Sequence, residues 1–408
     1  MDTIVFIGSN KSGTSREAIQ IAEQMGYFTV LFTDREKFLE QREEFLDVHQ
    51  MIYQKDLQQK ELILEQLDLL QQQGKRIKAC LSLIDPFVYS TAILSEELGL
   101  AKLSTGALYK IEEKTRFRQE LQSLNVNPWF NVVLFKASVN DIYADYKKCL
   151  PFIIKSPQSF GSKDVYLART EKDLEMSFHL LRKQFPKTSL LLEEYLEGPQ
   201  YLVEVLVLEG KIHIIAIIEQ EISNNNNRFI VTGYVFPATL SNDQHTKLEV
   251  TINKILTTLE MMHGSCHLEM RWVREEWKLI EVNPRMSGGA MNQIIIEGTG
   301  INLVKEIIKM NLGQESDITK TKNNHIYAHF ITVNAKGRLL KVTGKNRALS
   351  YEGVKEVFIK PRKGNILTPP FSMGDRYAYV IASANTPNEA KRIALTAAKE
   401  IKFYLDPF

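Results

Sequence analysis

The sequence predicts a protein of mixed α/β and α+β class, with a parallel sheet at its N-terminus and antiparallel strands after it. Residues 3–7 and 28–32 are apolar runs on either side of a helical pattern over 16–25, which is the order of a βαβ unit. Residues 201–219 contain two strand patterns joined by a Glu-Gly turn, which is typical of an antiparallel hairpin. Short strand patterns also dominate the chain after residue 325.

The composition indicates a globular protein and excludes several classes of partner. A chain of 408 residues with 44% hydrophobic residues can form about two or three domains. Its 51 basic and 49 acidic residues are closely mixed, so neither nucleic acid nor an acidic membrane surface is expected to bind. The three scattered cysteines follow no disulfide or metal spacing, and no segment reads as a signal peptide or membrane span. We expect a cytoplasmic protein.

The N-terminal region continues with a helical pattern over 57–73, a strand over 77–84 and a helix over 88–98. These elements complete an N-terminal βαβ domain over residues 1–110. The loop from Gly8 to Thr14 has the two glycines of a phosphate loop, but Thr14 stands where such a loop needs lysine. The βαβ unit keeps a nicotinamide oxidoreductase open as an alternative, which NADH fluorescence quenching would reveal.

A second hairpin carries the residues with the clearest chemistry. It is predicted from the strand patterns Cys266–Val273 and Trp277–Asn283, which the polar residues 274–276 separate. If Val273 pairs with Trp277, one face carries two opposed pairs. These pairs are Glu269 with Glu281 and His267 with Asn283. The opposite face, expected in the core, carries Leu268, Met270, Trp272, Lys278, Ile280 and Val282.

Two facing carboxylates repel each other, and burial strengthens the repulsion unless a cation lies between them. Mg²⁺ fits Glu269, Glu281 and Asn283, because it binds a few protein oxygens and completes its shell with water and phosphate. Arg285 follows after a proline that stiffens the strand exit. An ordinary amphipathic hairpin, with its glutamates in surface pairs, remains the alternative for this stretch alone.

Phosphate-binding groups are expected upstream of this hairpin. Lys155 lies inside the apolar run that begins at Pro151, and a lysine buried there needs an anionic partner. The turn that contains Gly161 and Ser162 offers backbone N–H groups and a hydroxyl to phosphate oxygens.

The arrangement H-x-E followed by E-x-N-P-R, which supplies Glu269, Glu281, Asn283 and Arg285, resembles the signature of the ATP-grasp carboxylate–amine ligases. The continuation Met-Ser-Gly-Gly is most similar to the L-amino acid ligase branch. The resemblance implies an ATP-grasp fold over residues 111–310 and a small β-rich C-terminal lobe over 311–408. It also implies ATP and Mg²⁺ as cofactors, with Mn²⁺ as the alternative metal.

The resemblance assigns roles to several further residues. The nucleotide-binding residues it implies are Lys114, Lys155, Gly161, Ser162, Glu193, Tyr195, Leu196 and Glu197, of which Glu197 is one candidate for the ribose. Arg285 and Lys155 are expected to stabilise the transferring phosphoryl group, and Arg118 to approach the substrate. The expected substrate contacts are His267, Ser287, Gly288 and Gly289, the last three at a helix start that favours an anion.

The reaction implied by the resemblance activates a carboxylate as an acyl phosphate at the expense of ATP and transfers the acyl group to an amine. A closing loop around Gly161 would protect the intermediate from water. Small-molecule carboxylates and amines, amino acids in particular, are the expected partners, and a homodimer is one expected assembly. Two alternatives stay open: transfer to a carrier-protein thiol, and ATP binding without catalysis.

Overall fold

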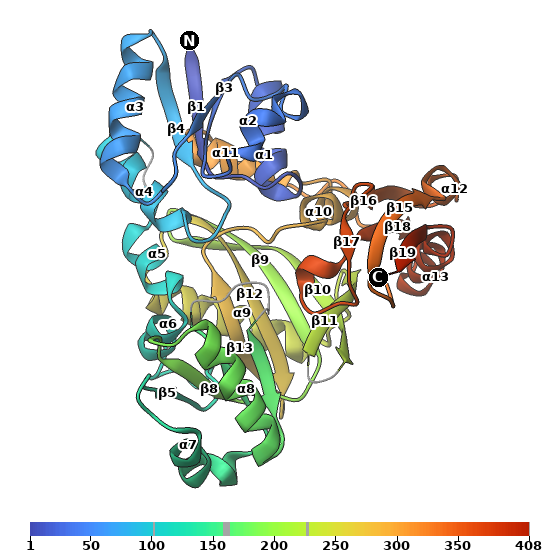
Figure 1. Cartoon of the computed structure of the whole chain (residues 1–408). Helices are drawn as coiled ribbons and strands as arrows, with labels where there is room; N and C mark the ends of the chain where they lie inside the picture. The colour runs from blue at the N-terminus through green and yellow to red at the C-terminus, as the bar shows by residue number, and fades with distance from the viewer. Residues whose placement is uncertain (101–102, 158–163, 226–227, 408) are drawn as a thin grey trace.

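The computed structural model describes residues 1–100, 103–157, 164–225 and 228–407. Gly161 and Ser162 lie outside the described residues. Four β-sheets and the helices that pack on them make up the described chain (Figure 1). Among the described helices, none combines the length and the apolar character needed to cross a bilayer.

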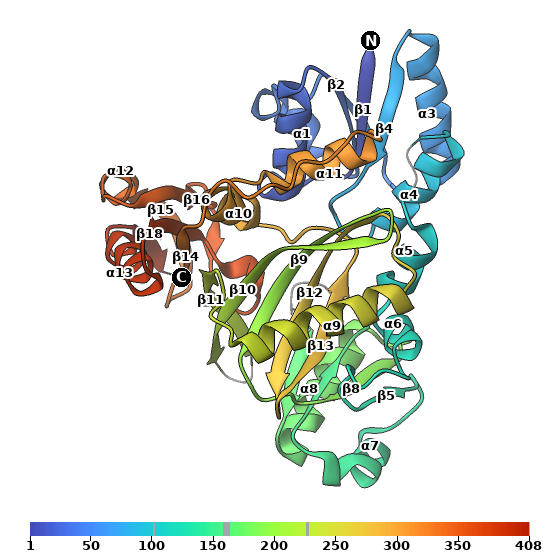
Figure 2. The ribbon, with the colours of Figure 1, turned by 180° about the vertical axis from the view of Figure 1, so that it is seen from behind.

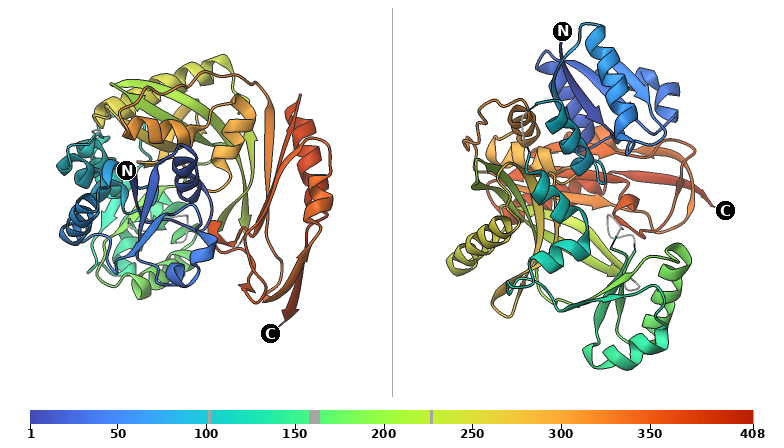
Figure 3. Two further views of the ribbon diagram at one scale, coloured as in Figure 1. Left: turned by 90° about the horizontal axis from the view of Figure 1, so that it is seen from above. Right: turned by 90° about the vertical axis from the view of Figure 1, so that its left-hand side faces the viewer.

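The N-terminal sheet is parallel, with the strand order β3-β2-β1-β4, as the predicted βαβ unit requires. Its strands are β1 (Asp2–Ile7), β2 (Phe28–Thr33), β3 (Gln50–Tyr53) and β4 (Arg76–Leu81). Helices α1 (Thr14–Gln24), α3 (Lys60–Gln72) and α4 (Val88–Glu97) cover its two faces (Figure 3). Ile4 and Phe6 belong to one core and Val5 and Ile7 to another, because successive side chains of a strand face opposite ways.

The largest sheet has eight strands in the order β13-β12-β9-β10-β11-β14-β18-β16. Its central strands are β9 (Gln200–Leu208), β10 (Lys211–Asn225), β11 (Arg228–Phe236), β12 (Gly264–Val273) and β13 (Glu276–Asn283). Helix α9 (Asn242–Thr258) covers one face (Figure 2). Helix α11 (Leu303–Asn311) contacts β12 on one side and α1 and β4 on the other, so it joins the large sheet to the N-terminal sheet.

A smaller antiparallel sheet has the strand order β5-β8-β6-β7. Its strands are β5 (Phe130–Val133), β6 (Phe152–Lys155), β7 (Val165–Ala168) and β8 (Leu190–Glu194). Helices α7 (Val139–Tyr146) and α8 (Glu171–Gln184) pack on one of its faces. Helices α5 (Thr105–Glu112) and α6 (Lys114–Glu120) lead into it from the N-terminal region (Figure 1).

The C-terminal region is rich in strands, but most of its strands do not form a sheet of their own. Strands β14 (His325–Ile331), β16 (Val354–Ile359) and β18 (Ala378–Ala384) extend the large sheet, and α13 (Pro387–Ala398) packs on them. A separate three-stranded sheet contains β15 (Gly337–Thr343), β17 (Ile366–Leu367) and β19 (Lys402–Pro407). The two remaining helices are α10 (Met291–Thr299) and α12 (Lys345–Leu349). The three-domain division at residues 110 and 310 stays a prediction.

The hairpin of β12 and β13 forms as predicted, but the expected pairing of Val273 with Trp277 is wrong. Trp277 pairs with Trp272, and the turn has only two residues, Arg274 and Glu275, both with positive φ angles of 50° and 62°. Such a two-residue turn matches the twist of the strands it joins. Without a further irregularity, this register would turn Glu281 toward the core.

A β-bulge restores the expected carboxylate pair. The register shifts between Glu269 and Met270, so Ile280 has no partner and Glu269 pairs with Glu281. The predicted core face of β13 is corrected for the same reason. Trp277 and Leu279 lie in the core, while Lys278 and Ile280 are only partly buried.

Candidate active site

A cleft of about 830 Å³ lies between the small antiparallel sheet and the large sheet. The residues that line it come from α6, from β6–β8 and from β9–β13, so strands of both sheets contribute. Its polar lining includes Lys114, Arg118, Lys155, Glu193, Glu194, Gln200, Glu269, Arg271 and Glu281, and its apolar lining includes Ile153, Val165, Leu196, Ile222, Phe229, Val231 and Ile280. Most of the predicted nucleotide and metal residues therefore meet in one cavity.

The two opposed carboxylates have different protonation properties. Burial and the neighbouring charge of Glu281 raise the pKa of Glu269 to about 7. Burial alone would raise the pKa of Glu281 as well, but Lys114 and Lys155 outweigh it and lower that pKa. One carboxylate is thus charged and neutralised by lysines, while the other would gain from an additional cation.

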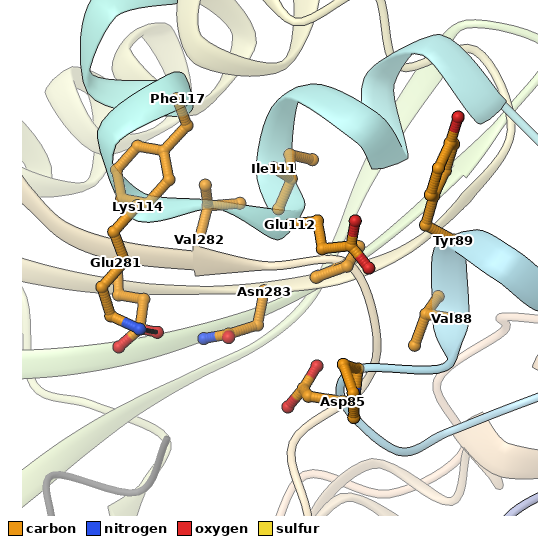
Figure 4. Close-up of a pocket in the computed structure, with 12 residues that line it drawn as sticks. Asp85, Val88, Tyr89, Ile111, Glu112, Lys114, Phe117, Glu281, Val282 and Asn283 are labelled. Atoms are coloured by element: carbon orange, nitrogen blue, oxygen red, sulfur yellow. Dashed lines mark ion pairs between the residues drawn. The ribbon is translucent and has the colours of Figure 1, made fainter. Parts of the chain in front are cut away.

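Lys114 and Lys155 place two buried cations at the cleft. The Lys114 Nζ atom lies 3.0 Å from Glu281 Oε1, and the Lys155 Nζ atom lies 2.6 Å from Glu193 Oε2. The two lysines are only 6% and 4% exposed. Figure 4 shows Lys114 against the Glu281 carboxylate, with Asn283 beside them. Two desolvated ammonium groups are suited to a polyanion such as triphosphate.

His267 fixes the orientation of the third expected metal ligand. Its Nδ1 atom is 2.8 Å from the Arg285 carbonyl oxygen, and its Nε2 atom is 3.2 Å from the Asn283 amide nitrogen. Burial and the charge of Arg285 lower the pKa of His267 to about 4, so the ring is neutral at pH 7. Nδ1 then donates and Nε2 accepts, which leaves the Asn283 carbonyl oxygen for another partner. His267 contacts these two residues rather than an open substrate surface.

The residues at the pair fit a hard divalent cation. They offer two carboxylates and one amide oxygen, which are ligand types that Mg²⁺ prefers. Among the described residues, no three His, Cys, Asp or Glu side chains are grouped to hold a metal by themselves. A cation here would need further oxygen ligands, which fits a site completed by water and substrate phosphates.

Tyr195 and Leu196, two of the predicted adenine contacts, line the cleft where β8 ends. The Tyr195 ring stacks on Phe229, with 6.0 Å between the ring centroids. Arg271 donates to the Leu196 carbonyl oxygen and, over 3.0 Å, to Gln200 Oε1. Glu197 is exposed and is not among the residues that line the cleft, so it does not take the ribose position expected from the sequence. Glu194 does line the cleft.

Arg285 does not reach into the cleft as a free cation. Its Nε atom donates to Asp85 Oδ2 over 2.8 Å, and its Nη1 atom donates to the Met286 carbonyl oxygen over 2.9 Å. Asp85 was not predicted, although a carboxylate directly after a buried parallel strand is a recognisable signal. A hollow of about 370 Å³ adjoins the cleft at Lys114 and Glu281 and also reaches Asp85 (Figure 4).

The predicted substrate segment after Arg285 divides into a buried and an exposed part. Ser287 is buried and donates its backbone N–H to Glu204 Oε1 over 3.1 Å, and its hydroxyl donates to the same oxygen. Gly288 and Gly289 are exposed just before α10, whose first turn has no side-chain cap. The exposed glycines thus keep the predicted anion site at a helix start open, while Ser287 is already committed to Glu204.

Glu204 was also missed, although a lone carboxylate in the apolar run of β9 is the same kind of signal as Lys155 in β6. The side chain is fully buried, and its Oε2 atom has no hydrogen-bond partner among the described residues. Burial raises the pKa of Glu204 to about 7, against a normal value of 4.5. The folded protein therefore retains this proton over a pH range in which the unfolded chain has lost it.

We expect Glu204→Gln to flatten the dependence of stability on pH. The folded wild type should lose stability as pH rises from 4.5 to about 7, by up to roughly 3 kcal/mol at ~1.4 kcal/mol for each pH unit between the two pKa values. Urea unfolding at pH 5 and pH 8 measures this difference. The variant should gain on the wild type at pH 8, whereas parallel pH profiles would contradict the assignment.

Comparisons with known proteins agree with this geometry. A family model of the ATP-grasp domain matches residues 148–293, and a model of the L-amino acid ligase C-terminal domain 2 matches residues 329–406. The crystal structure of L-amino acid ligase from Bacillus licheniformis superposes with a TM-score of 0.84 at 19% identity, covering 100% of this chain and 99% of that one.

Two curated relatives extend the comparison. Uncharacterized protein y4rH of Sinorhizobium fredii is 28% identical over 263 residues, which is 64% of this chain and 54% of that protein. Carnosine synthase 1 of Mus musculus is 22% identical over 256 residues, which is 58% of this chain and 31% of that protein. The chain thus matches about half the length of the first relative and about a third of the second.

The fold and the cleft define an ATP-grasp protein. Within that class, the chain carries the L-amino acid ligase C-terminal domain 2 and resembles the L-amino acid ligases, which confirms the resemblance found in the sequence.

Proposed function

We propose that this protein is an ATP-dependent carboxylate–amine ligase that couples an amino acid, through its carboxylate, to an amine. A carboxylate oxygen attacks the γ-phosphorus of ATP and ADP leaves, which gives an acyl phosphate. The amine nitrogen then attacks the acyl carbon, phosphate leaves, and the nitrogen loses a proton. The relationship to the L-amino acid ligases and carnosine synthase supports this reaction class.

The observation that carries the proposal is the carboxylate pair of Glu269 and Glu281 in a cleft with Lys114 and Lys155. When bound, Mg²⁺ would neutralise phosphate oxygens during phosphoryl transfer, and Glu269, Glu281 and Asn283 would hold it. Mn²⁺ is the alternative metal. Lys155 and Lys114 would bind the triphosphate, and Tyr195 and Leu196 would contact the base.

The hollow around Asp85 is our candidate for the carboxylate substrate, because it adjoins the metal pair and lies near the paired Arg285. We propose that Arg285 acts on the transferring phosphoryl group only after it has exchanged Asp85 for the substrate. Gly288 and Gly289 would add backbone N–H groups to that anion. Gly161 and Ser162 remain predicted contacts of the phosphates.

The decisive experiment measures ADP release with ATP and Mg²⁺ against a panel of amino acid pairs. We expect release that requires both a carboxylate and an amine, with an amide as the second product. Binding of ATP and Mg²⁺ without ADP release for any pair would contradict ligase activity with free amino acids. Release that requires an added carrier-protein thiol instead of an amine would replace the amine as acceptor.

Cytoplasmic location and a homodimer stay predictions. Separation of the purified chain by size, with light scattering, tests the assembly directly.

A further inference from the structure

Arg118 on α6 is fully buried, with 0% exposure. Its Nε atom donates to Glu193 Oε1 over 2.9 Å, and its Nη1 atom donates to the Leu279 carbonyl oxygen over 2.7 Å and to Asn127 Oδ1 over 3.1 Å. Its Nη2 atom donates to the Ile280 carbonyl oxygen over 2.6 Å. All three nitrogens of the guanidinium are engaged by the protein, so Arg118 does not approach the substrate as its sequence position indicated.

Two of these acceptors are consecutive carbonyls of β13. In a regular strand, successive carbonyls point to opposite edges, so one side chain cannot bind both from the same edge. The bulge at Ile280 brings both carbonyls to one edge. That edge is the free edge of the large sheet, because β13 is its terminal strand, and the Leu279 N–H there donates to the Val126 carbonyl oxygen over 2.7 Å. Arg118 closes the edge where the ladder is broken.

The bulge decides which way Glu281 faces. With the two-residue turn and no extra residue in β13, the register between Trp272 and Trp277 would continue and would pair Glu281 with Leu268, a core residue. Because Ile280 is extra, Glu281 pairs with Glu269 and lines the cleft. Whatever holds the bulge therefore holds a predicted metal ligand in place.

We propose that Arg118 is a positioning residue that fixes the bulge, and thereby Glu281, in the geometry that binds the metal. Through Glu193, which also pairs with Lys155, it ties this geometry to the strand that ends at the nucleotide hinge. This inference rests on the proposed function, since it assigns a metal to Glu281. Arg118 touches none of the reacting groups in this arrangement.

The planar guanidinium is essential to this role. It presents donors in a fixed fork, whereas a lysine ammonium is a single flexible point charge. Arg118→Lys keeps a buried cation opposite Glu193 but cannot bind the carboxylate and two consecutive carbonyls together. The variant thus separates the geometric role from the charge.

The test measures Mn²⁺ binding by electron paramagnetic resonance with a non-hydrolysable ATP analogue present, together with thermal unfolding. We expect Arg118→Lys to weaken metal binding by about tenfold or more, as loss of a group that orients a ligand does. Its melting temperature and its affinity for the analogue in EDTA should stay near wild type. Arg116→Gln, on the same helix but paired with Glu113 at the surface, should leave all three values unchanged.

Asn127→Ala, which removes one group that orients Arg118, should weaken metal binding in the same direction but less. This variant decides the matter if Arg118→Lys does not fold. Wild-type metal binding in Arg118→Lys, or in Asn127→Ala when that variant must decide, would overturn the proposal. Because the readout is binding, it separates this inference from the reaction: a wild type that binds metal but releases no ADP would refute only the proposed function.

Discussion

Replacing Glu281 by glutamine should abolish ATP turnover while leaving the fold intact. Loss of this ligand removes several kcal/mol of charge stabilisation, and ~1.4 kcal/mol corresponds to tenfold in rate, so we expect a drop on the order of a thousandfold. The fold should survive, because the change also removes the repulsion with Glu269, and Lys114 retains that carboxylate as a neighbour. ADP release and thermal unfolding are measured on the same preparation.

Glu276→Gln is the matched control for this variant. Glu276 begins the same strand but is exposed and pairs with Lys278 and Asn125 outside the cleft. Its activity should equal that of the wild type. Full activity in Glu281→Gln would remove the metal role of this residue.

Lys155→Met should lower kcat/KM for ATP by about a hundredfold, because the variant loses a buried cation that we assign to the triphosphate. The protein should still fold, since Glu193 keeps its 2.9 Å contact with Arg118 after the lysine is gone. Initial rates over a range of ATP concentrations, at saturating carboxylate and amine, measure the effect.

Lys183→Met provides the comparison on the same subdomain. Lys183 lies on α8 and is exposed, so its removal changes the net charge equally without affecting the cleft. Equal kinetics of the two variants would show that Lys155 does not act on the nucleotide.

Local patterns were sufficient to predict most of the fold. The βαβ unit, the two hairpins and the buried lysine of β6 each follow from apolar periodicity over a few residues. The L-amino acid ligase relationship was accessible because Glu269, Glu281, Asn283 and Arg285 are close in sequence.

The parts that failed depend on contacts between distant segments. The bulge at Ile280 leaves no mark in the pattern of β13, and the Arg118 side chain that binds it is 161 residues away from Leu279. The partner of Arg285 is Asp85, 200 residues earlier, and only the packed structure pairs them. The same distance hides the continuation of the large sheet into β14, because strand patterns do not specify their neighbours.

The central claim is that two carboxylates, from Glu269 and Glu281, hold one cation for ATP. A crystal structure of the protein with Mn²⁺ and a non-hydrolysable ATP analogue, with the metal located by anomalous scattering, tests it most directly. We expect one strong anomalous peak within coordination distance of both carboxylates and of the analogue's phosphates. A peak elsewhere in the cleft, with Lys114 still paired to Glu281, would contradict the claim.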